Sequence, residues 1–466
     1  MRPRAAAIAA TGAVLVALTA GGAGRSASRL LPAIGWERIS GPTGAGQQLG
    51  LARALNGNLH VIWNRGTSAS ATIFDTQISS AGTVLAPTRV ASGWDGADGL
   101  ALLRMRDGSL RLFATGGHAV GLPPGEVGVN TLSAPASGRD WTLDQGQVWG
   151  GAPAAAASFV GATLTKDGMP VTAWAGGGAS NFLIGLLRQG TPVQACVCAT
   201  VGSADVVTDG ETGAVVLAGQ TSASPAGTYV EQILPGIRGR HVLASARSDA
   251  GDYGISAREG AAGVYVAYSD ARVVRLYGYG GGTTTFARGP FTVAKAFPGP
   301  DGRLWIDRGD NRGVFVTRSN RAVTRFEPVR GIAPPPGTTY LGNAQGEGSL
   351  GPLDLFVDAS TGGARGFWHT YVLPEPTLHA AIAKTDISGN ARGPGAYKAT
   401  FSVADAGDPL QGATVVVLLG GTKLAAVKTG AGGSASGTFG GGVHTTLTAT
   451  ASVPGYAKAT TTVKVP

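Results

Sequence analysis

Acidic, basic and aromatic residues recur in the polar segments that separate the short hydrophobic runs of this sequence. Aromatic rings stack on the apolar faces of sugars, and an arginine guanidinium binds a carboxylate through two parallel hydrogen bonds. If the fold gathers these residues, they suit the binding of a sugar or an acidic group; otherwise they are ordinary solvated loop residues. The candidate binding residues are Trp94, Asp95, Asp98, Asp249, Asp252, Tyr253, Asp270, Arg272, Asp310 and Arg312, and Asp205 lies in a further segment of this kind.

Common catalytic and cofactor motifs are absent from the sequence. It has no GxSxG elbow, no phosphate loop ending in Gly-Lys-Ser or Gly-Lys-Thr, and no HExxH pair. Its six histidines never stand at metal-ligand spacing. We therefore expect no metal and no cofactor, and the sequence assigns no catalytic residue.

Two cysteines, Cys196 and Cys198, lie in the segment QACVCAT. An even number of cysteines in an exported protein commonly forms disulfides. Residues two apart in an extended strand have Cα atoms about 6.5 to 7 Å apart, at the limit for a bridge, so a disulfide here needs a bulge or a turn. The alternative is two small buried side chains on one face of a strand.

The N-terminus predicts an export signal. The basic stretch MRPR precedes an apolar run from Ala5 to Ala20 and a small-residue segment from Gly21 to Ser28. These are the three regions of a secretory signal peptide, and the run is shorter than the ~20 residues of a spanning helix. We expect residues 1–28 to be removed and the mature protein to be secreted, extracellular or held at the cell surface, with no transmembrane segment.

Composition favours an all-β protein. The chain has 466 residues with 76 Gly and 26 Pro, and only 14% of its residues are charged. Short Val, Ala, Thr and Leu runs alternate with turn residues, which is typical of strands and hairpins. The formal charge of +9 comes from scattered basic residues, whereas a nucleic-acid-binding protein concentrates them on one face, so we expect no nucleic-acid partner.

A hairpin-like fragment recurs through the middle of the chain. Each copy has an apolar strand, a tight turn with glycine, and a second strand rich in aliphatic and aromatic residues. Asn-Gly and Asp-Gly steps at several of these turns predict type I′ hairpins, in which both central residues have positive φ. The turn glycines are Gly57, Gly108, Gly168, Gly213, Gly263 and Gly302, at spacings of 39 to 60 residues.

Repeats of about fifty residues, each with room for four strands, are typical of β-propeller blades. A further unit from Leu353 to Pro374 brings the number to seven, although six remains open, and a two-sheet sandwich is the structural alternative. The segment from Trp36 to Ile39 would close the ring by joining the last blade. The predicted fold is therefore a six- or seven-bladed propeller over 33–374, with the candidate residues in the loops around its mouth.

The last part of the chain predicts a separate domain. The proline-bearing stretch LPEPTL at 373–378 predicts a semi-rigid linker, which we place at residues 375–382. Residues 383–466 contain about seven short strands of alternating apolar and polar residues, which fit an immunoglobulin-like β-sandwich. The run DAGDPLQGATVVV, followed by a late GYA, resembles the bacterial immunoglobulin-like and carboxypeptidase-regulatory-like modules at the ends of secreted proteins. That resemblance covers roughly the last ninety residues.

The blade pattern resembles the propellers of the sialidase superfamily. Members of that family carry Asp-box turns of the form SxDxGxxW, use three arginines to bind a carboxylate, and have a tyrosine nucleophile with an acid/base aspartate. Here the nearest fragment, SGRDWTL from Ser137 to Leu143, lacks the aspartate, glycine and spacing of the box. The resemblance therefore implies the blade geometry and not the catalytic set.

Two functions follow from these observations. The first is a monomeric, secreted binding or scaffold protein that recognises a glycan or a cell-envelope partner at the propeller mouth. The second is an exported sialidase-like glycoside hydrolase, which requires two carboxylates about 5 to 9.5 Å apart over one pocket.

Overall fold

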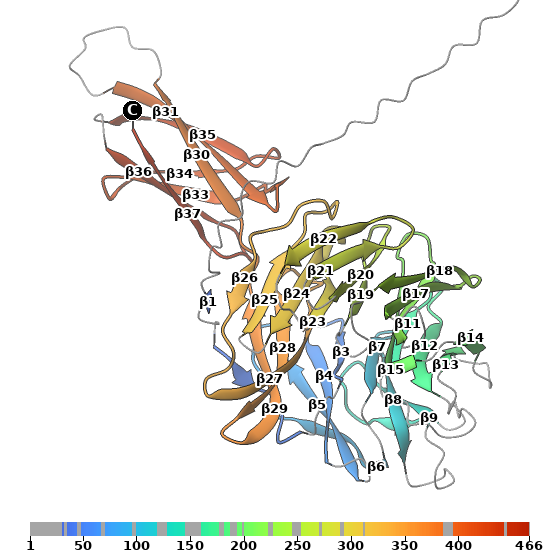
Figure 1. The fold of residues 1–466 in the computed structure, drawn as a ribbon. Coiled ribbons are helices and arrows are strands. Elements are labelled where there is room, and N and C mark those ends of the chain that lie inside the picture. Colours follow the sequence, from blue (N-terminus) through green and yellow to red (C-terminus); the bar gives the residue numbers. More distant parts are fainter. Residues whose placement is uncertain are drawn as a thin grey trace, which may run out of the picture.

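The chain folds into a ring of β-sheets with a smaller β-sandwich beside it (Figure 1). The computed structural model describes residues 30–31, 35–43, 48–66, 70–95, 99–118, 128–144, 160–176, 181–186, 193–197, 200–221, 227–244, 253–269, 273–288, 293–310, 313–384, 395–441 and 445–465. The predicted signal peptide lies outside these residues. Within them, no helix is long and apolar enough to cross a membrane.

The first three sheets of the ring are four-stranded and antiparallel, and we call them blades 1 to 3. Blades 1 and 2 are also joined, because the last strand of blade 1 pairs with the second strand of blade 2 through Trp94 and His118. Their strands are β3 (Gly50–Arg53), β4 (Leu59–Arg65), β5 (Ala71–Ile78) and β6 (Thr88–Asp95); β7 (Leu100–Arg104), β8 (Leu110–His118), β9 (Gly128–Ala134) and β10 (Thr142–Leu143); and β11 (Val160–Leu164), β12 (Pro170–Gly176), β13 (Asn181–Leu186) and β14 (Val193–Val197).

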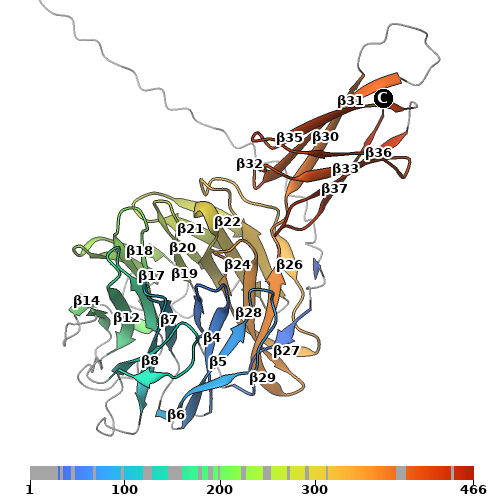
Figure 2. The same cartoon turned by 180° about the vertical axis from the view of Figure 1, so that it is seen from behind.

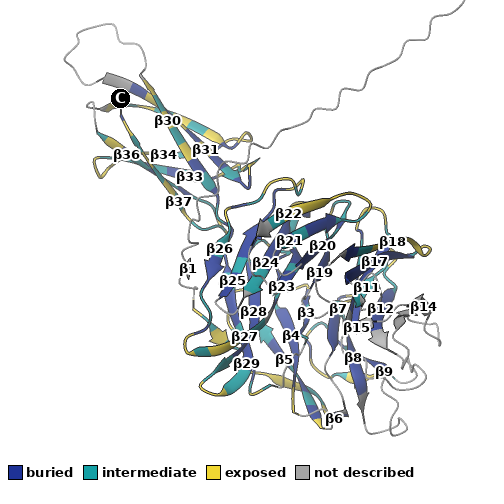
Figure 3. Ribbon diagram, in the orientation of Figure 1, coloured by how far each residue is buried: buried dark blue, intermediate teal, exposed yellow. Residues whose placement is uncertain are grey.

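Blades 4 and 5 repeat the same order of four antiparallel strands. Aliphatic residues fill the space between these two blades, so consecutive blades share a hydrophobic core. Figure 3 shows the buried residues concentrated in the inner strands of the ring. The strands are β15 (Thr200–Thr208), β16 (Val215–Thr221), β17 (Gly227–Leu234) and β18 (Arg238–Ala244); and β19 (Gly254–Ala257), β20 (Val264–Ser269), β21 (Val273–Gly278) and β22 (Thr283–Arg288).

Blades 6 and 7 complete the ring. Blade 7 takes its outer strand from the start of the chain, where Arg38 pairs with Trp368, so the predicted closure by the segment around Trp36 to Ile39 is confirmed. The strands are β23 (Val293–Pro298), β24 (Leu304–Asp310), β25 (Gly313–Arg318) and β26 (Arg330–Ile332), with β1 (Leu30–Leu31) added beside β26; and β27 (Thr338–Glu347), β28 (Leu353–Thr361), β29 (Ala364–Val372) and β2 (Glu37–Arg38). One 3-10 turn, η1 (Pro300–Gly302), joins β23 to β24.

The first strand of each blade contacts the first strand of the next, from β3 through β7, β11, β15, β19, β23 and β27 back to β3. The ring is thus closed around a central axis, and the fold is a β-propeller. Within the described residues the ring contains seven antiparallel units of four strands, of which the first two share one sheet and the sixth is extended by β1; the sequence left six or seven blades open.

The hairpin turns between the first and second strands correct one local expectation. In blade 1, Gly57 N donates to Ala54 O (3.0 Å) and Ala54 N to Asn58 O (2.8 Å), so the loop has three residues. Only its glycine has positive φ (86°), and blades 2 and 3 repeat this pattern. These are type I turns with a glycine bulge rather than type I′ turns, because asparagine or aspartate stays in the ordinary helical region.

The predicted type I′ geometry does occur in blade 6. Asp301 and Gly302 both have positive φ, 55° and 74°, and Arg303 N donates to Pro300 O at 3.1 Å. Proline before the two central residues restricts the backbone of the turn, and aspartate tolerates the left-handed region better than most residues. The sequence therefore identified this turn in blades 1 to 6 but missed the one before β28 in blade 7, because the predicted unit from Leu353 to Pro374 covers the second and third strands of that blade. It assigned the correct turn type at only some of the six positions.

Hydrogen bonds join each of these turns to the turn region of the next blade. In five of these contacts, an arginine, lysine or tryptophan side chain donates to a backbone carbonyl. In the other two, a backbone N–H donates to a carboxylate and an arginine pairs with a glutamate. Blades 1, 2, 3 and 5 supply arginine or lysine to these contacts, which accounts for part of the scattered basic residues. The contacts, in ring order, are Arg104 to Arg53 O, Arg106 to Lys166 O, Lys166 to Glu211 O, Gly263 N to Asp209, Arg258 to Gly302 O, Trp305 to Gly351 O and Arg53 to Glu347.

The C-terminal residues form two sheets that pack face to face around one apolar core, as in a β-sandwich. The first strand begins at Thr377, inside the segment 375–382 that the sequence predicted as a linker. Leu378 and its alternate neighbours pack into this core, which explains why the segment is a strand. The strands are β30 (Thr377–Lys384), β31 (Gly395–Asp405), β32 (Asp408–Pro409) and β35 (Ser434–Gly441) in one sheet, and β33 (Thr414–Leu419), β34 (Thr422–Lys428), β36 (Thr446–Ser452) and β37 (Ala459–Lys464) in the other.

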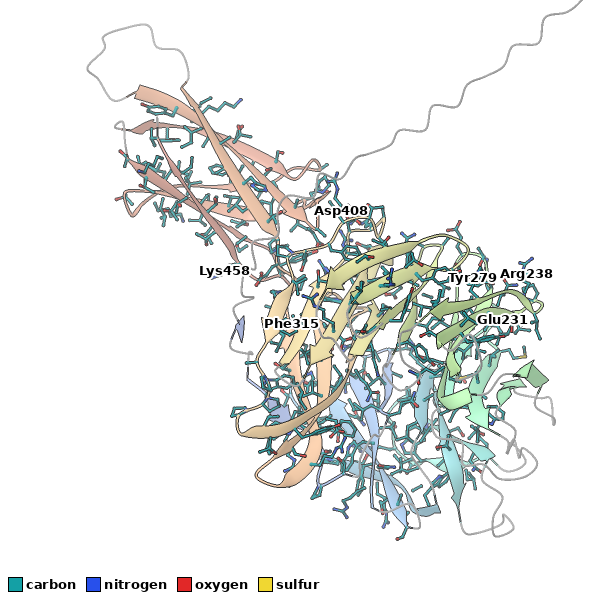
Figure 4. All side chains as sticks on the ribbon, in the orientation of Figure 1. Glu231, Arg238, Tyr279, Phe315, Asp408 and Lys458 are labelled. Atoms are coloured by element: carbon teal, nitrogen blue, oxygen red, sulfur yellow. The ribbon has the colours of Figure 1, made fainter. Side chains whose placement is uncertain are left out.

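Buried charges join the sandwich to blade 6. Arg318, which is fully buried, donates to Asp405 of the sandwich, and Tyr456 Oη donates to the same carboxylate at 2.8 Å. Arg303 donates to Asp408 at 2.8 Å, and Figure 4 labels Asp408 where the sandwich meets the propeller. Burial acts to raise the pKa of Asp405, but the hydrogen bond and charge of Arg318 hold that pKa below its usual range.

Glu327 lies beside this network and is almost fully buried. Burial raises the pKa of its carboxyl to about 8, even though Arg318 Nε lies 3.6 Å from its Oε1 and acts in the opposite direction. The propeller and the sandwich are therefore held together by a buried polar contact in addition to the chain that connects them. Figure 2 shows the ribbons of these two parts from the other side.

Candidate functional site

A cavity of about 270 Å³ lies on the axis of the propeller. Its walls come from the first strands of all seven blades, together with residues that directly precede them. A cavity of this size in the middle of a closed ring is a common position for a ligand site. The lining residues are Gln48, Leu49, Leu51, Leu100, Ala101, Leu102, Val160, Gly161, Ala162, Ala204, Asp205, Tyr253, Gly254, Ile255, Lys295, Ala296, Phe297, Pro298, Gln345 and Gly346.

The inner strands present polar backbone to this cavity. Each first strand pairs with the second strand of its own blade and with no other described strand, so its second edge faces the axis. Gln48 satisfies part of this edge: its Nε2 donates to Val160 O (2.8 Å), and its Oε1 accepts from Val160 N (3.1 Å). Gln345 Oε1 accepts from Leu49 N at 2.9 Å. The cavity wall is thus already organised for hydrogen bonding.

One level of the channel carries two charged residues among small ones. In blades 1 to 6, the residue three positions before the end of the first strand occupies a similar place. Neighbouring inner strands approach closely there, so a small side chain is required at most of these positions. The residues at this level in blades 1 to 6 are Gly50, Ala101, Gly161, Asp205, Gly254 and Lys295, whereas blade 7 contributes Gln345 and Gly346 to the cavity.

Asp205 fits at this level because the preceding blade has glycine there. A Cβ on Gly161 would lie 2.5 Å from Asp205 Cα and 2.6 Å from its Oδ1, so any larger residue would displace the aspartate. Asp205 Oδ1 accepts a hydrogen bond from Val206 N at 2.8 Å. Burial in the channel raises the pKa of Asp205 to about 6, against the smaller opposing effects of that hydrogen bond and of the Lys295 charge.

Lys295 has the same arrangement two blades further round the ring. A Cβ on Gly254 would lie 2.7 Å from Lys295 Cα, so glycine again leaves the room that the charged residue needs. The backbone N of Lys295 donates to Asp307 Oδ1 at 3.0 Å, which fixes this part of the strand. The ammonium attracts Asp205 across the cavity, yet the two described side chains form no direct salt bridge.

Tyr253 also lines the cavity but directs its hydroxyl elsewhere. Its Oη donates to Ala218 O at 3.0 Å, and only 8% of the residue is exposed. The tyrosine therefore contributes ring surface to the wall. With Leu102 and Phe297 it forms an apolar part of the lining, next to the charged level.

Among the other predicted residues, Trp94 is the one whose side chain the structure describes, and it does not line this cavity. Trp94 is 1% exposed in the core between blades 1 and 2, where its Nε1 donates to Thr115 O at 2.9 Å, so its ring has no free face for a ligand. Asp95 and Asp310 stand at strand ends, and their side chains are not described. The others lie outside the described residues: Asp98, Asp249, Asp252, Asp270, Arg272 and Arg312.

The cysteine prediction also stays open. Cys196 pairs through its backbone with Phe182 between β14 and β13, in the strand that the sequence led us to expect. Its side chain is not described, and Cys198 lies outside the described residues.

Two buried histidine–aspartate pairs lie elsewhere in the propeller. His60 Nδ1 lies 2.7 Å from Asp75 Oδ2, and both residues are fully buried beneath Gly138, where a Cβ would overlap the imidazole. His369 Nε2 lies 2.9 Å from Asp354 Oδ1 in blade 7. Both pairs are buried, and Asp354 also accepts a hydrogen bond from Arg53 of blade 1 at 2.5 Å, so that pair belongs to the contact between blades 7 and 1. Among the described residues, no three histidine, cysteine or acidic side chains are placed to share a metal ion.

Sequence reasoning placed Asp205 in a polar segment near the mouth but did not single out Lys295, Gln48 or Gln345. A signal for the lysine was present, because AKAFPG carries one charge within an otherwise small and apolar inner strand. The same is true of SADVVT around Asp205. Comparing the repeats position by position would have shown that two of six equivalent places hold charged residues.

Comparison with known proteins gives structural likeness only. No family model and no curated protein matches the sequence. Similar solved structures include the polysaccharide lyase Uly1 (TM-score 0.45, 10% identity, 72% of this chain and 92% of that one) and virginiamycin B lyase from Staphylococcus aureus (0.43, 9%, 72% and 99%). A prolyl endopeptidase also matches (0.41, 11%, 78% and 55%). At these TM-scores the likenesses carry no argument about function, and the propeller assignment rests on the strand pairing above.

Proposed function

We propose that this protein is a recognition protein whose propeller channel binds a polar ligand. The observation that carries the proposal is the charged level of the channel, where Asp205 and Lys295 occupy positions that packing reserves for small residues. Desolvating charged groups costs stability, and proteins retain such groups chiefly at functional sites. Glycines at the neighbouring positions accommodate both side chains, so the arrangement is built into two separate blades.

The biological setting in this proposal follows from the N-terminus. Cleavage after about residue 28 would export the protein, and the ligand would then be a glycan or another component of the cell envelope. The C-terminal sandwich, which we interpret as an immunoglobulin-like module, would hold the propeller at a fixed orientation through the Arg318–Asp405 contact. We propose a monomer, since each part of the molecule has its own apolar core.

Hydrolysis is not the function that we propose. A glycosidase needs two carboxylates about 5 to 9.5 Å apart flanking one pocket. Among the described residues that line the cavity, Asp205 supplies one carboxyl and no second acidic residue stands beside it. The lining therefore suits binding better than this type of acid and base chemistry.

The test is a binding screen of the mature protein by isothermal titration calorimetry. The ligand panel contains neutral, uronate-bearing and sialylated glycans together with short envelope peptides. A cavity-filling variant, Ala162→Leu, is expected to weaken any channel ligand at least tenfold, whereas Ala426→Leu on the exposed strand β34 leaves binding unchanged. Ligands that bind both variants equally would place recognition elsewhere and refute the channel.

A further inference from the structure

The two charges in the channel are opposite and lie on the same level, with the glycine of β19 between them in the ring. Asp205 is carried by β15 and Lys295 by β23, two inner strands that are separated in the ring by β19. The charge of Lys295 acts to lower the pKa of the Asp205 carboxyl, but the two side chains form no direct salt bridge. A ligand that enters between them meets an ammonium on one side and a carboxyl on the other.

We infer that the channel binds one zwitterionic group, of the size of an amino acid or a dipeptide, with its ammonium at Asp205 and its carboxylate at Lys295. This inference rests on the proposed function, because it requires the channel to be the ligand site. It names the chemical class that the channel selects.

Charge matching is the reason for this choice. An anionic ligand would be attracted by Lys295 and repelled by the Asp205 carboxylate. A cationic ligand would be attracted by Asp205 and repelled by Lys295. A neutral sugar would displace water from both charges without replacing it by a counter-charge. Only a ligand with both charges matches both groups, and charge-assisted hydrogen bonds are the stronger ones in a partly desolvated site.

Size and wall chemistry agree with this class. The cavity volume of about 270 Å³ is at the lower end of the ~300 to 1,000 Å³ range of ligand pockets, which matches a ligand of the size of an amino acid or a dipeptide. Unpaired strand edges around the axis offer backbone donors and acceptors to a peptide group. The apolar wall near Leu102 and Phe297 can take up a short aliphatic side chain.

Protonation of the aspartate gives a second readout. The titratable side chains among the described lining residues are Asp205, Lys295 and Tyr253. The carboxyl of Asp205, with its pKa near 6, is ionised at pH 7.5 and largely protonated at pH 5. The preference for a ligand ammonium should therefore be strong at pH 7.5 and shrink toward pH 5.

The experiment compares three ligands with the full mature chain by isothermal titration calorimetry at pH 7.5. The probes are L-alanyl-L-alanine, its N-acetyl form, which has no ammonium, and its C-terminal amide, which has no carboxylate. We expect the zwitterion to bind about 10- to 100-fold more tightly than either singly charged form, as one charge-assisted hydrogen bond implies. Equal affinity for the N-acetyl form would overturn the inference.

Variants assign each charge. Asp205→Asn should lower the affinity for the dipeptide to that for the N-acetyl form, and Lys295→Met should lower it to that for the amide. Lys423→Met, on the exposed strand β34, is the matched control and should change nothing. If both channel variants bind the dipeptide as the wild type does, the inference is refuted.

The outcomes also separate this inference from the proposed function. A glycan that binds and is sensitive to Ala162→Leu, with no binding of the dipeptide, would refute the zwitterion and leave the channel as the site. Absence of any ligand sensitive to Ala162→Leu would refute both.

Discussion

Replacing Asp205 by asparagine should stabilise the protein, and only above a certain pH. The pKa of this carboxyl is about 6 in the fold and about 4 in an unfolded chain. A carboxyl whose pKa is higher in the folded chain than in the unfolded chain does not reduce the free energy of unfolding below the unfolded pKa. The free energy of unfolding then falls as the pH rises from the unfolded pKa through the folded pKa. The wild type should therefore lose stability between about pH 4 and pH 6.5, and Asp205→Asn should not.

The magnitude follows from the size of the shift. About two pKa units correspond to roughly 3 kcal/mol at 1.36 kcal/mol per unit, and partial access to water in the channel reduces this to about 2 kcal/mol. At pH 8 the variant should be more stable than the wild type by about that amount. At pH 4 the two should differ by less than about 0.5 kcal/mol, because the carboxyl is then protonated in the folded chain and about half protonated in the unfolded chain.

The assay is urea unfolding followed by tryptophan fluorescence at pH 4, 6 and 8. Asp107→Asn is the matched control, since Asp107 is exposed on the turn after β7 and its pKa is lowered by hydrogen bonds from Ser109. That control should gain no stability at pH 8. If Asp205→Asn proves less stable than the wild type at pH 8, the aspartate is a structural residue and the reasoning behind the channel site fails.

Two further predictions concern packing and the join between the two parts. Gly161→Ala should destabilise the protein by about 1 to 3 kcal/mol in urea unfolding, because the new Cβ would overlap the backbone of Asp205. The control is Gly210→Ala, whose new Cβ would have no atom nearer than 3.7 Å. Equal losses of stability in the two variants would contradict the account. Asp405→Ala should cost about 3 to 5 kcal/mol, since it removes the carboxylate that directly accepts a hydrogen bond from the buried Arg318. Arg321→Ala removes an exposed pair and should cost less than about 1 kcal/mol, and a similar cost for both would refute the buried contact.

The sequence predicted the architecture well because the information is local. Turn glycines such as Gly57 and Gly108 mark hairpins at a steady spacing, and this spacing indicates blades before any contact between them is known. Ring closure by the segment around Trp36 could be predicted too, since one blade lacked an outer strand. The turn type was harder, because Asn-Gly fits both a type I′ turn and a type I turn with a glycine bulge.

The site was predicted less well because it depends on alignment between blades. Trp94 looks like a surface residue in a polar loop, yet its ring packs in the core and its Nε1 bonds to a backbone carbonyl. Asp205 and Lys295 are ninety residues apart in sequence and come to one level only when seven inner strands are set side by side. Spacing alone cannot provide that register, although position-by-position comparison of the repeats can.

The central claim is that the channel between Asp205 and Lys295 is the ligand site. Its most direct test is a crystal structure of the mature protein with the tightest ligand from the screen. The account predicts that the ligand lies on the propeller axis, with polar groups in hydrogen-bond contact with both side chains. A ligand bound on the outer strands or on the sandwich, with neither side chain in contact, would contradict it.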